Sequence, residues 1–324
     1  MPLLRGSLSR DPHAQAVFAK ERPVVYRAYG DALAWSGDAA AAVAVFERGV
    51  LEGYWPHGAQ CRPAKARPVL GIPLHTLPAR TQFPHVAVKL ESALEMMQRE
   101  FQAVDAADVE GSDVWMRESA GLHSHGSSGS WHVLVLVVNG QPQHKGCSRM
   151  PDTCALLMSL PSVRHLRDGQ VSPRLMAPPR QSRFTLQAKL SRMTPGTRVL
   201  PHAGPTNLRL RLQLPIRVHE HGNSRIRVAT HGWRTWSVNQ SFVFDESCEH
   251  EVEVGGALAR TVLLVDFANP LLVSKQDYVS VALRLARGDG LDDQVLQAHA
   301  LEAASEWEQA QAHWQRNRAL NGEL

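Results

Sequence analysis

Two histidines and one arginine carry the clearest chemical signal in this chain. His202 lies in PHAGPTNLRLRLQLP (201–215), His250 lies in FDESCEHEVEV (244–254), and Arg260 begins the otherwise apolar run RTVLLVDF. Two imidazoles on facing strands can hold a divalent metal ion. An arginine within apolar sequence needs an anion to pair with, and a carboxylate is its best bidentate match. Together these residues point to a site for iron(II) and 2-oxoglutarate, and so to an oxygenase.

Strand alternation predicts which of these side chains face inward. In CEHEVEV, His250 shares its face with a cysteine and two valines, whereas three glutamates share the other face. A lone inward histidine is more often a satisfied core residue than a ligand, and His202 is what favours the metal interpretation. For Arg260, a structural carboxylate such as Asp266 or Asp245 is the alternative partner.

The segment NLRLRLQL (207–214) alternates strictly between leucines and polar residues. The leucines must pack on a core, whereas Asn207, Arg209, Arg211 and Gln213 face either water or a polar pocket. Two arginines on a strand that leads from a candidate metal histidine suggest an anionic substrate. A solvated sheet face is the alternative that alternation alone leaves open.

The elements around these residues are mostly short strands. The strand candidates are WHVLVLVVNG, RFTLQAKLSRM, NLRLRLQL, SRIRVAT, QSFVFD, HEVEV and RTVLLVDF, a series typical of a sandwich or barrel. Residues 86–104 have the pattern of an amphipathic helix, and residues 57–84 contain five prolines and should form an irregular connector. The C-terminal end returns to a helical pattern.

The N-terminal residues 13–52 also have a helical pattern, with a turn expected at SGD (36–38). Their spacing resembles that of a tetratricopeptide repeat at Tyr26, Tyr29, Gly30, Leu33, Ala42 and Phe46. One such unit cannot bury its own apolar face, so it must pack on something else. A plain helical hairpin that caps the domain is the alternative.

The composition is that of an ordinary globular protein. Of the 324 residues, 44% are hydrophobic and 20% are charged, and the formal net charge is +4. A chain of this length can form one large domain and a smaller helical one. The basic residues are scattered, so no nucleic-acid partner is indicated, and no run suggests a membrane span. No convincing signal peptide is visible. We therefore expect the chain as given to be soluble, either cytoplasmic or in the endoplasmic reticulum lumen if a targeting segment is missing.

None of the four cysteines forms a C-x-x-C zinc pair. Cys147 and Cys154 flank the segment SRMPDT and could close a small disulfide loop, but spacing alone favours two free thiols. The histidine-rich triplets HSH (123–125) and HEH (219–221) are expected to be solvent-exposed rather than metal-binding.

Several segments resemble one known family, the aspartyl/asparaginyl β-hydroxylases. PHAGPTNLRLRLQLP, FDESCEHEVEV and RTVLLVDFANPLL are similar to its motifs, and QCRPAKARPVLGIPLHTLP and GCSRMPDTCALLMSLP resemble its lead-in and its cysteine loop. The resemblance covers roughly residues 54–272. It implies an Fe(II)- and 2-oxoglutarate-dependent dioxygenase with a double-stranded β-helix, a jelly-roll or cupin-like fold, flanked by helices.

The resemblance also implies the roles of the site residues. His202 and His250 would ligate iron, and Gly204 stands where most related oxygenases have a third, carboxylate ligand. Ser191 and Arg260 would bind the far carboxylate of 2-oxoglutarate.

Two further roles and a disulfide follow from the same resemblance. Trp131 would line the cosubstrate pocket, and Arg211 would face the substrate carboxylate. Cys147 and Cys154 match a pair that is disulfide-linked in secretory members.

Three positions depart from the family pattern. Gln213, in the cosubstrate pocket, replaces a common histidine, and Glu246 is one methylene longer than the usual aspartate. Val133 replaces a glutamine, so the usual substrate contact is in doubt.

The predicted reaction is hydroxylation at the β-carbon of an Asp or Asn residue in a protein or peptide, in family members an EGF-like domain. Molecular oxygen would be consumed, and succinate and CO2 released. The alternatives are a hydroxylase of a free amino acid or other small acidic substrate, and an inactive scaffold. The expected division is a tetratricopeptide-like region (1–56), an oxygenase domain (57–274) and a C-terminal helical segment (275–324).

Overall fold

A computed structural model describes most of the chain. The described residues are 25–54, 58, 76–106, 114–118, 128–138, 140–160, 163, 186–204, 209–218, 223–229 and 231–268, with isolated positions between 294 and 312. The expected domain boundaries, both histidine-rich triplets and nearly all of the expected C-terminal helix lie outside these residues.

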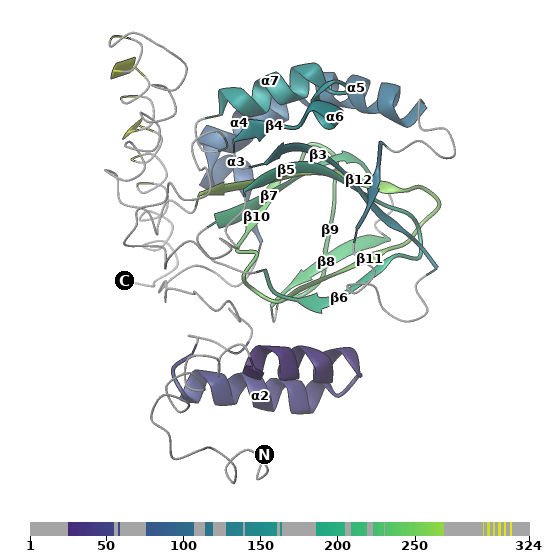
Figure 1. Ribbon diagram of the computed structural model, residues 1–324, viewed down its shortest axis with the longest axis vertical. Helices are drawn as coiled ribbons and strands as arrows, with labels where there is room; N and C mark the ends of the chain where they lie inside the picture. The colour runs from purple at the N-terminus through teal and green to yellow at the C-terminus, as the bar shows by residue number, and fades with distance from the viewer. Residues whose placement is uncertain are drawn as a thin grey trace.

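Two antiparallel sheets face each other (Figure 1). The larger contains β1 (Leu77–Pro78), β2 (Met116–Arg117), β3 (Trp131–Val138), β4 (Gln141–Pro142), β5 (Gln187–Met193), β7 (Arg209–Arg217), β10 (Phe242–Phe244) and β12 (Arg260–Ala268). The smaller contains β6 (Arg198–His202), β8 (Ser224–Val228), β9 (Arg234–Thr235) and β11 (His250–Val254). Their orders are β1-β10-β7-β12-β5-β3-β2, with β4 beside β3, and β6-β11-β8-β9.

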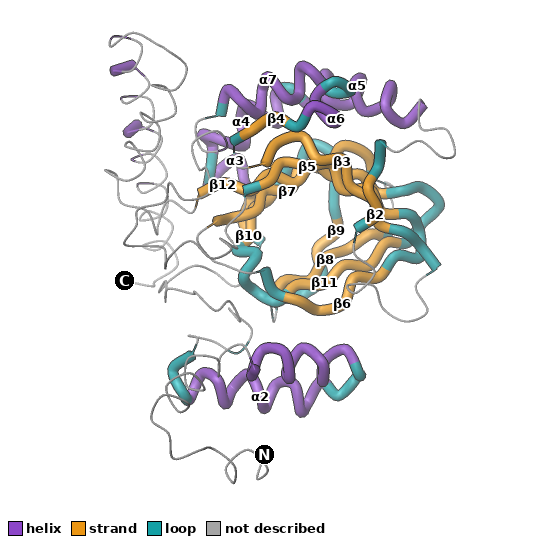
Figure 2. Tube along the Cα trace, viewed as in Figure 1, coloured by secondary structure: helices purple, strands orange, loops and turns teal. Residues whose placement is uncertain are grey.

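From β5 onward the chain winds back and forth between the two sheets. β5, β7, β10 and β12 belong to the larger sheet, and β6, β8, β9 and β11 belong to the smaller. This is the winding of a double-stranded β-helix, and the strands enclose a flattened barrel seen end-on in Figure 2. The mainly β, antiparallel architecture is therefore confirmed, and each of the seven strand candidates contains a strand.

Helices cover the outer face of the larger sheet (Figure 1). They are α3 (Ala79–Gln82), α4 (Pro84–Ser92), α5 (Leu94–Ala106), α6 (His144–Cys147) and α7 (Pro151–Ser159). Their apolar side chains form one buried cluster with the outward side chains of the sheet, among them Leu210, Leu212 and Leu214 of β7. The leucine face of the alternating segment thus packs on the core, as predicted. Among the described residues, none of the helices combines the length and the apolar character that a bilayer span needs.

Three local predictions were wrong. The helix expected at 86–104 is two helices that meet at Ala93, a break that lets both Leu90 and Leu94 enter the core. The expected irregular connector contains β1, α3 and the start of α4, because its end must pair with β10 and pack under the sheet. Cys147 and Cys154 are not the free thiols that spacing alone favours: the turn between α6 and α7 brings their Cα atoms to 5.5 Å, and the disulfide that the family resemblance implies joins them.

The N-terminal region is a pair of helices, over residues 25–35 and α2 (Ala39–Leu51). The turn lies at 36–38, as predicted, and Asp38 caps α2 by accepting a hydrogen bond from the Ala41 amide at 3.0 Å. The ring of Phe46 packs so closely on Gly30 that no side chain fits at residue 30. These contacts explain why the two helices associate.

The first of these helices also contacts the smaller sheet, at the end of β6. Trp35 Nε1 donates a hydrogen bond to the Pro201 carbonyl at 3.1 Å, and an Arg27 Nη donates one to the Ala203 carbonyl at 3.2 Å. The helical pair therefore lies against the strand that carries His202 (Figure 1).

Candidate metal and cosubstrate site

His202 and His250 face each other on neighbouring strands of the smaller sheet. They are paired directly across β6 and β11, and their ring centroids are 4.2 Å apart. His202 Nδ1 lies 2.8 Å from the Leu200 carbonyl and His250 Nδ1 lies 2.9 Å from the Cys248 carbonyl. Because a carbonyl only accepts, each Nδ1 carries the proton and each Nε2 keeps a lone pair for a metal ion. Two such imidazoles suit iron(II).

Burial keeps both imidazoles in the neutral form. Desolvation lowers the pKa of His202, against smaller opposing effects of the Leu200 carbonyl, Glu246 and Asp31. Desolvation, followed by repulsion from His202, lowers the pKa of His250 to about 3. Since a metal binds the neutral ring, protons do not compete strongly at neutral pH.

Gly204 leaves no side chain where a third, carboxylate ligand would follow His202. Its amide donates a hydrogen bond to the Glu246 carbonyl at 2.7 Å, and a Cβ built at residue 204 would collide with the Glu246 side chain. The contact with Glu246 therefore requires glycine at residue 204, independently of any role in the candidate metal site.

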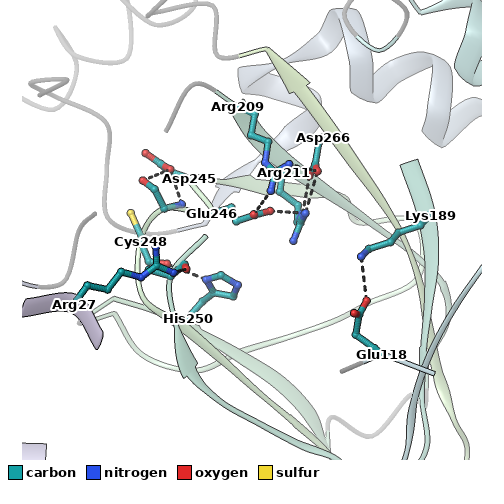
Figure 3. Close-up of polar contacts among 12 residues, drawn as sticks. Arg27, Glu118, Lys189, Arg209, Arg211, Asp245, Glu246, Cys248, His250 and Asp266 are labelled. Carbon is teal, nitrogen blue, oxygen red and sulfur yellow. Dashed lines mark hydrogen bonds and ion pairs between the residues drawn. The ribbon is translucent and has the colours of Figure 1, made fainter. Parts of the chain in front are cut away.

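A buried charge network fills the wall beside Glu246 (Figure 3). Arg211 pairs with Asp266 through two bonds of 2.7 and 3.0 Å, and Glu246 pairs with both Arg209 and Arg211. Burial would lower the pKa of Arg211, but Asp266 and Glu246 outweigh that effect and raise it. Burial would likewise raise the pKa of Glu246, but Arg209 and Arg211 lower it. The described part of the polar face of β7 is thus buried in the barrel interior and is not a solvated sheet face.

Arg211 was expected to face a substrate carboxylate. In the structure its guanidinium is already held by Asp266 and Glu246. A substrate carboxylate would have to join this network or displace one of its members.

Arg260 is a buried cation for which the described part of the chain provides no anion. It is 1% exposed, its guanidinium lies 4.1 Å over the Trp236 ring, and its Nε and Nη1 have no hydrogen-bond partner among the described residues. The structural carboxylates considered as alternatives are engaged elsewhere, since Asp266 pairs with arginines of β7 and Asp245 accepts from Ser247. Desolvation lowers the pKa of Arg260 to about 9. A bound carboxylate is the partner that this guanidinium lacks, so the residues fit 2-oxoglutarate.

The other expected cosubstrate residues share the inner face of the larger sheet with Arg260. Ser191 is paired with Val262 of β12, and Trp131 Nε1 donates a hydrogen bond to Ser191 Oγ at 3.0 Å. Gln213 is paired with Leu264 of the same strand.

Sequence reasoning missed two residues of the barrel interior, Trp236 and Lys189. Trp236 Nε1 donates a hydrogen bond to Gln213 Oε1 at 2.8 Å, and Trp236 follows β9, a strand too short for alternation to assign a face. Lys189 lies two residues before Ser191, so alternation could have found it. Its Nζ lies 3.3 Å from Glu118, a pair drawn in Figure 3, and Lys189 lies on the same sheet as Arg211 with β12 between their strands.

Comparison with known proteins identifies the family. The sequence profile described as Aspartyl/Asparaginyl beta-hydroxylase matches residues 91–270, more than half of the 324 residues.

Individual relatives agree with this match. The aspartyl/asparaginyl beta-hydroxylases of Homo sapiens and Mus musculus are each 34% identical over 148 residues, which cover 46% of this chain and 17% of theirs. Aspartate beta-hydroxylase domain-containing protein 2 of Xenopus tropicalis is 28% identical over 217 residues, 64% of this chain and 52% of its own. The chain thus spans about half or less of the length of these relatives. It belongs to the aspartyl/asparaginyl β-hydroxylase family, as its motifs implied.

Proposed function

We propose that this protein hydroxylates the β-carbon of Asp or Asn residues in a protein or peptide, with release of succinate and CO2. The observation that carries the proposal is the unpartnered guanidinium of Arg260, buried in the same barrel as two facing imidazoles. Burying an uncompensated cation costs stability, and a scaffold protein has no use for it. A cosubstrate carboxylate gives it a purpose.

In this proposal His202 and His250 hold iron(II) through their Nε2 atoms, and Arg260 and Ser191 bind the far carboxylate of 2-oxoglutarate. Iron and 2-oxoglutarate, when bound, supply the activation of molecular oxygen. The chain's own residues orient both groups and keep the imidazoles neutral.

The substrate is proposed to carry a carboxylate or amide side chain, as the family description suggests, and an EGF-like domain is the first to test. The interior-wall cations Arg209, Arg211 and Lys189 are matched by Glu246, Asp266 and Glu118, so the wall offers an acidic group hydrogen-bond donors rather than a surplus of positive charge. Val133, an apolar and buried residue of the same wall, is the observation that favours a small acidic substrate as the second candidate.

We also propose that the N-terminal helical pair is a tetratricopeptide-like unit. The contact of Phe46 with Gly30 supports this, because both positions belong to the repeat-like spacing. The proposed division of the chain stays 1–56, 57–274 and 275–324.

The test is succinate formation by the purified full chain with Fe(II), 2-oxoglutarate and oxygen, with and without an EGF-like peptide, followed by mass spectrometry of the peptide. Succinate coupled to a gain of one oxygen atom is the expected result. His202→Ala should abolish turnover without unfolding the protein. Arg48→Ala on α2 is the control and should leave both turnover and the fold unchanged. Succinate without peptide modification would point to a small acidic substrate. No succinate from folded, iron-loaded protein would reject the proposal.

A further inference from the structure

We infer that Trp131 and Trp236 set the hydrogen-bond polarity of the cosubstrate pocket, so that the hydroxyl hydrogen of Ser191 and the amide hydrogens of Gln213 are free to donate to a ligand beside Arg260. The two tryptophans would be positioning residues that act through Ser191 and Gln213, and the ligand of the pocket would be the carboxylate of a 2-oxo acid. The inference rests on the proposed function, since it concerns how 2-oxoglutarate is held.

The first part of the argument is the contact between Trp131 and Ser191. A hydroxyl can both donate and accept, whereas an indole N–H can only donate. Trp131 Nε1 lies 3.0 Å from Ser191 Oγ, so the oxygen accepts there and its own proton must point elsewhere. Ser191 is fully buried, and among the described residues no acceptor takes that proton. A bound anion can take it.

The second part is the contact between Trp236 and Gln213. An amide side chain can turn either its oxygen or its nitrogen toward a neighbour, and the two ends are ordinarily hard to tell apart. Here the neighbour is Trp236 Nε1 at 2.8 Å, which can only donate, so the Gln213 oxygen must face it. The amide nitrogen, with two donor hydrogens, therefore points away from Trp236.

The third part is the position of Arg260. One indole ring contacts both groups, because the Trp236 face lies 4.1 Å from the Arg260 guanidinium while its N–H bonds Gln213. Gln213 and Arg260 thus both contact the same indole ring. Ser191 lies on the neighbouring strand, paired with the residue two places after Arg260. Hydroxyl, amide and guanidinium donors thus lie on one inner face with no protein acceptor among the described residues, which suits a carboxylate and disfavours a cationic ligand.

The pocket should accept another side chain at residue 213 only if it keeps this polarity. A neutral histidine that accepts the Trp236 proton on one ring nitrogen must carry its own proton on the other, so Gln213→His still offers a donor. A glutamate accepts the same proton but presents an oxygen and a negative charge to the ligand. Gln213→His and Gln213→Glu therefore differ in the quantity at issue.

The experiment measures the dissociation constant of 2-oxoglutarate by calorimetry on the full chain loaded with Mn(II), which prevents turnover. Trp236→Phe keeps a ring under Arg260 and removes the N–H. It should weaken binding about five- to tenfold, as expected for one oriented hydrogen bond to a charged group. Trp233→Phe is the matched control, because Trp233 also lies under arginines, Arg225 and Arg227, but outside the pocket, and it should bind normally.

A double-mutant cycle separates polarity from a general structural effect. If Trp236 acts through Gln213, then Trp236→Phe adds no further loss to Gln213→Leu, and Mn(II) affinity is unchanged in every variant. Trp131→Phe should behave in the same way toward Ser191→Ala. Gln213→His should bind within about threefold of the unmodified protein, and Gln213→Glu should not bind measurably.

The inference is overturned if Trp236→Phe binds 2-oxoglutarate normally, or if it weakens binding equally when Gln213 is leucine. In both cases the proposed function stands, because the unmodified protein binds. If the unmodified, Mn(II)-loaded protein shows no 2-oxoglutarate binding, the proposed function fails and this inference fails with it.

Discussion

The pKa values of Arg211 and Arg260 in this barrel depend on whether a carboxylate pairs with the guanidinium. Arg260 has no anion, Arg211 has two, and the same depth in the protein lowers the pKa of the first and leaves that of the second raised. The carboxylates that pair with Arg211 thus distinguish a guanidinium that holds the wall together from Arg260, which can receive a ligand. Residue type and alternation do not predict which arginine is paired, since both are arginines on the inner face of the larger sheet.

Arg260 should limit stability while it permits binding. Arg260→Met removes a buried, unpaired cation and keeps an apolar chain over Trp236, so we expect the free energy of unfolding to rise by about 1–4 kcal/mol in ligand-free protein. Binding of 2-oxoglutarate should be lost. Urea unfolding and calorimetry measure the two quantities, and a marked loss of stability in this variant would show that Arg260 has a structural anion.

His250 should make the metal-free protein sensitive to acid. Its pKa is near 6.5 when exposed and about 3 when folded, so the unfolded chain binds a proton that the folded chain does not. The contribution to stability is complete above about pH 6.5 and is lost as the pH falls toward 3, by about 1.4 kcal/mol per pH unit. Urea unfolding of the chelator-treated protein from about pH 7 to 5 should show this slope. The slope should be reduced in His250→Asn and kept in His231→Asn, and equal slopes in all three proteins would contradict the argument.

At the scale of elements, β6 is the strand whose position matters most, and it is supported from both sides. β11 pairs with it inside the sheet, and the helix at 25–35 bonds the carbonyls that flank His202 through Trp35 and Arg27. A ligand-bearing strand at the edge of its sheet is thereby restrained by an element far away in sequence.

The combined variant Arg27→Ala and Trp35→Phe should loosen β6 and weaken Mn(II) binding by about two- to tenfold, the effect of one or two partly exposed hydrogen bonds. Arg48→Ala is the control, because Arg48 pairs with Glu52 on the other helix. Unchanged metal affinity in the combined variant would show that β11 alone positions His202.

The elements also show what the sequence could predict. β7, β11 and β12 alternate over at least five residues, so their inner and outer faces were assigned correctly. β6 was missed because it is short and contains Pro201, and β9 because two residues carry no period. The family resemblance supplied Ser191 and Trp131, but it could not supply Trp236, whose role depends on two sheets meeting.

In the molecule as a whole, the larger sheet separates the helical layer on its outer face from the barrel interior on its inner face. Its outer face packs on α4, α5 and α7, with the disulfide between Cys147 and Cys154 on that side, and its inner face carries the cosubstrate residues. The same strands serve both, since adjacent residues of β7 point to opposite sides.

Loss of the disulfide should therefore affect stability and not binding. Replacing Cys147 and Cys154 with serine should lower the free energy of unfolding by about 2–3 kcal/mol, the amount for so short a loop. The dissociation constant of 2-oxoglutarate should stay within about twofold, because the site is on the opposite face. A large loss of 2-oxoglutarate affinity in stably folded protein would show that the helical layer shapes the pocket.

The contact between Gly204 and Glu246 has a consequence for how this sequence can change. An aspartate at 204, one substitution toward a three-ligand iron site, would collide with Glu246, and shortening residue 246 to aspartate alone would draw its carboxylate back from Arg209 and Arg211. Each single step is unfavourable, and only the two together reach the alternative. Residues 204 and 246 therefore constrain each other, and this mutual constraint favours retention of the candidate two-histidine site when the sequence changes.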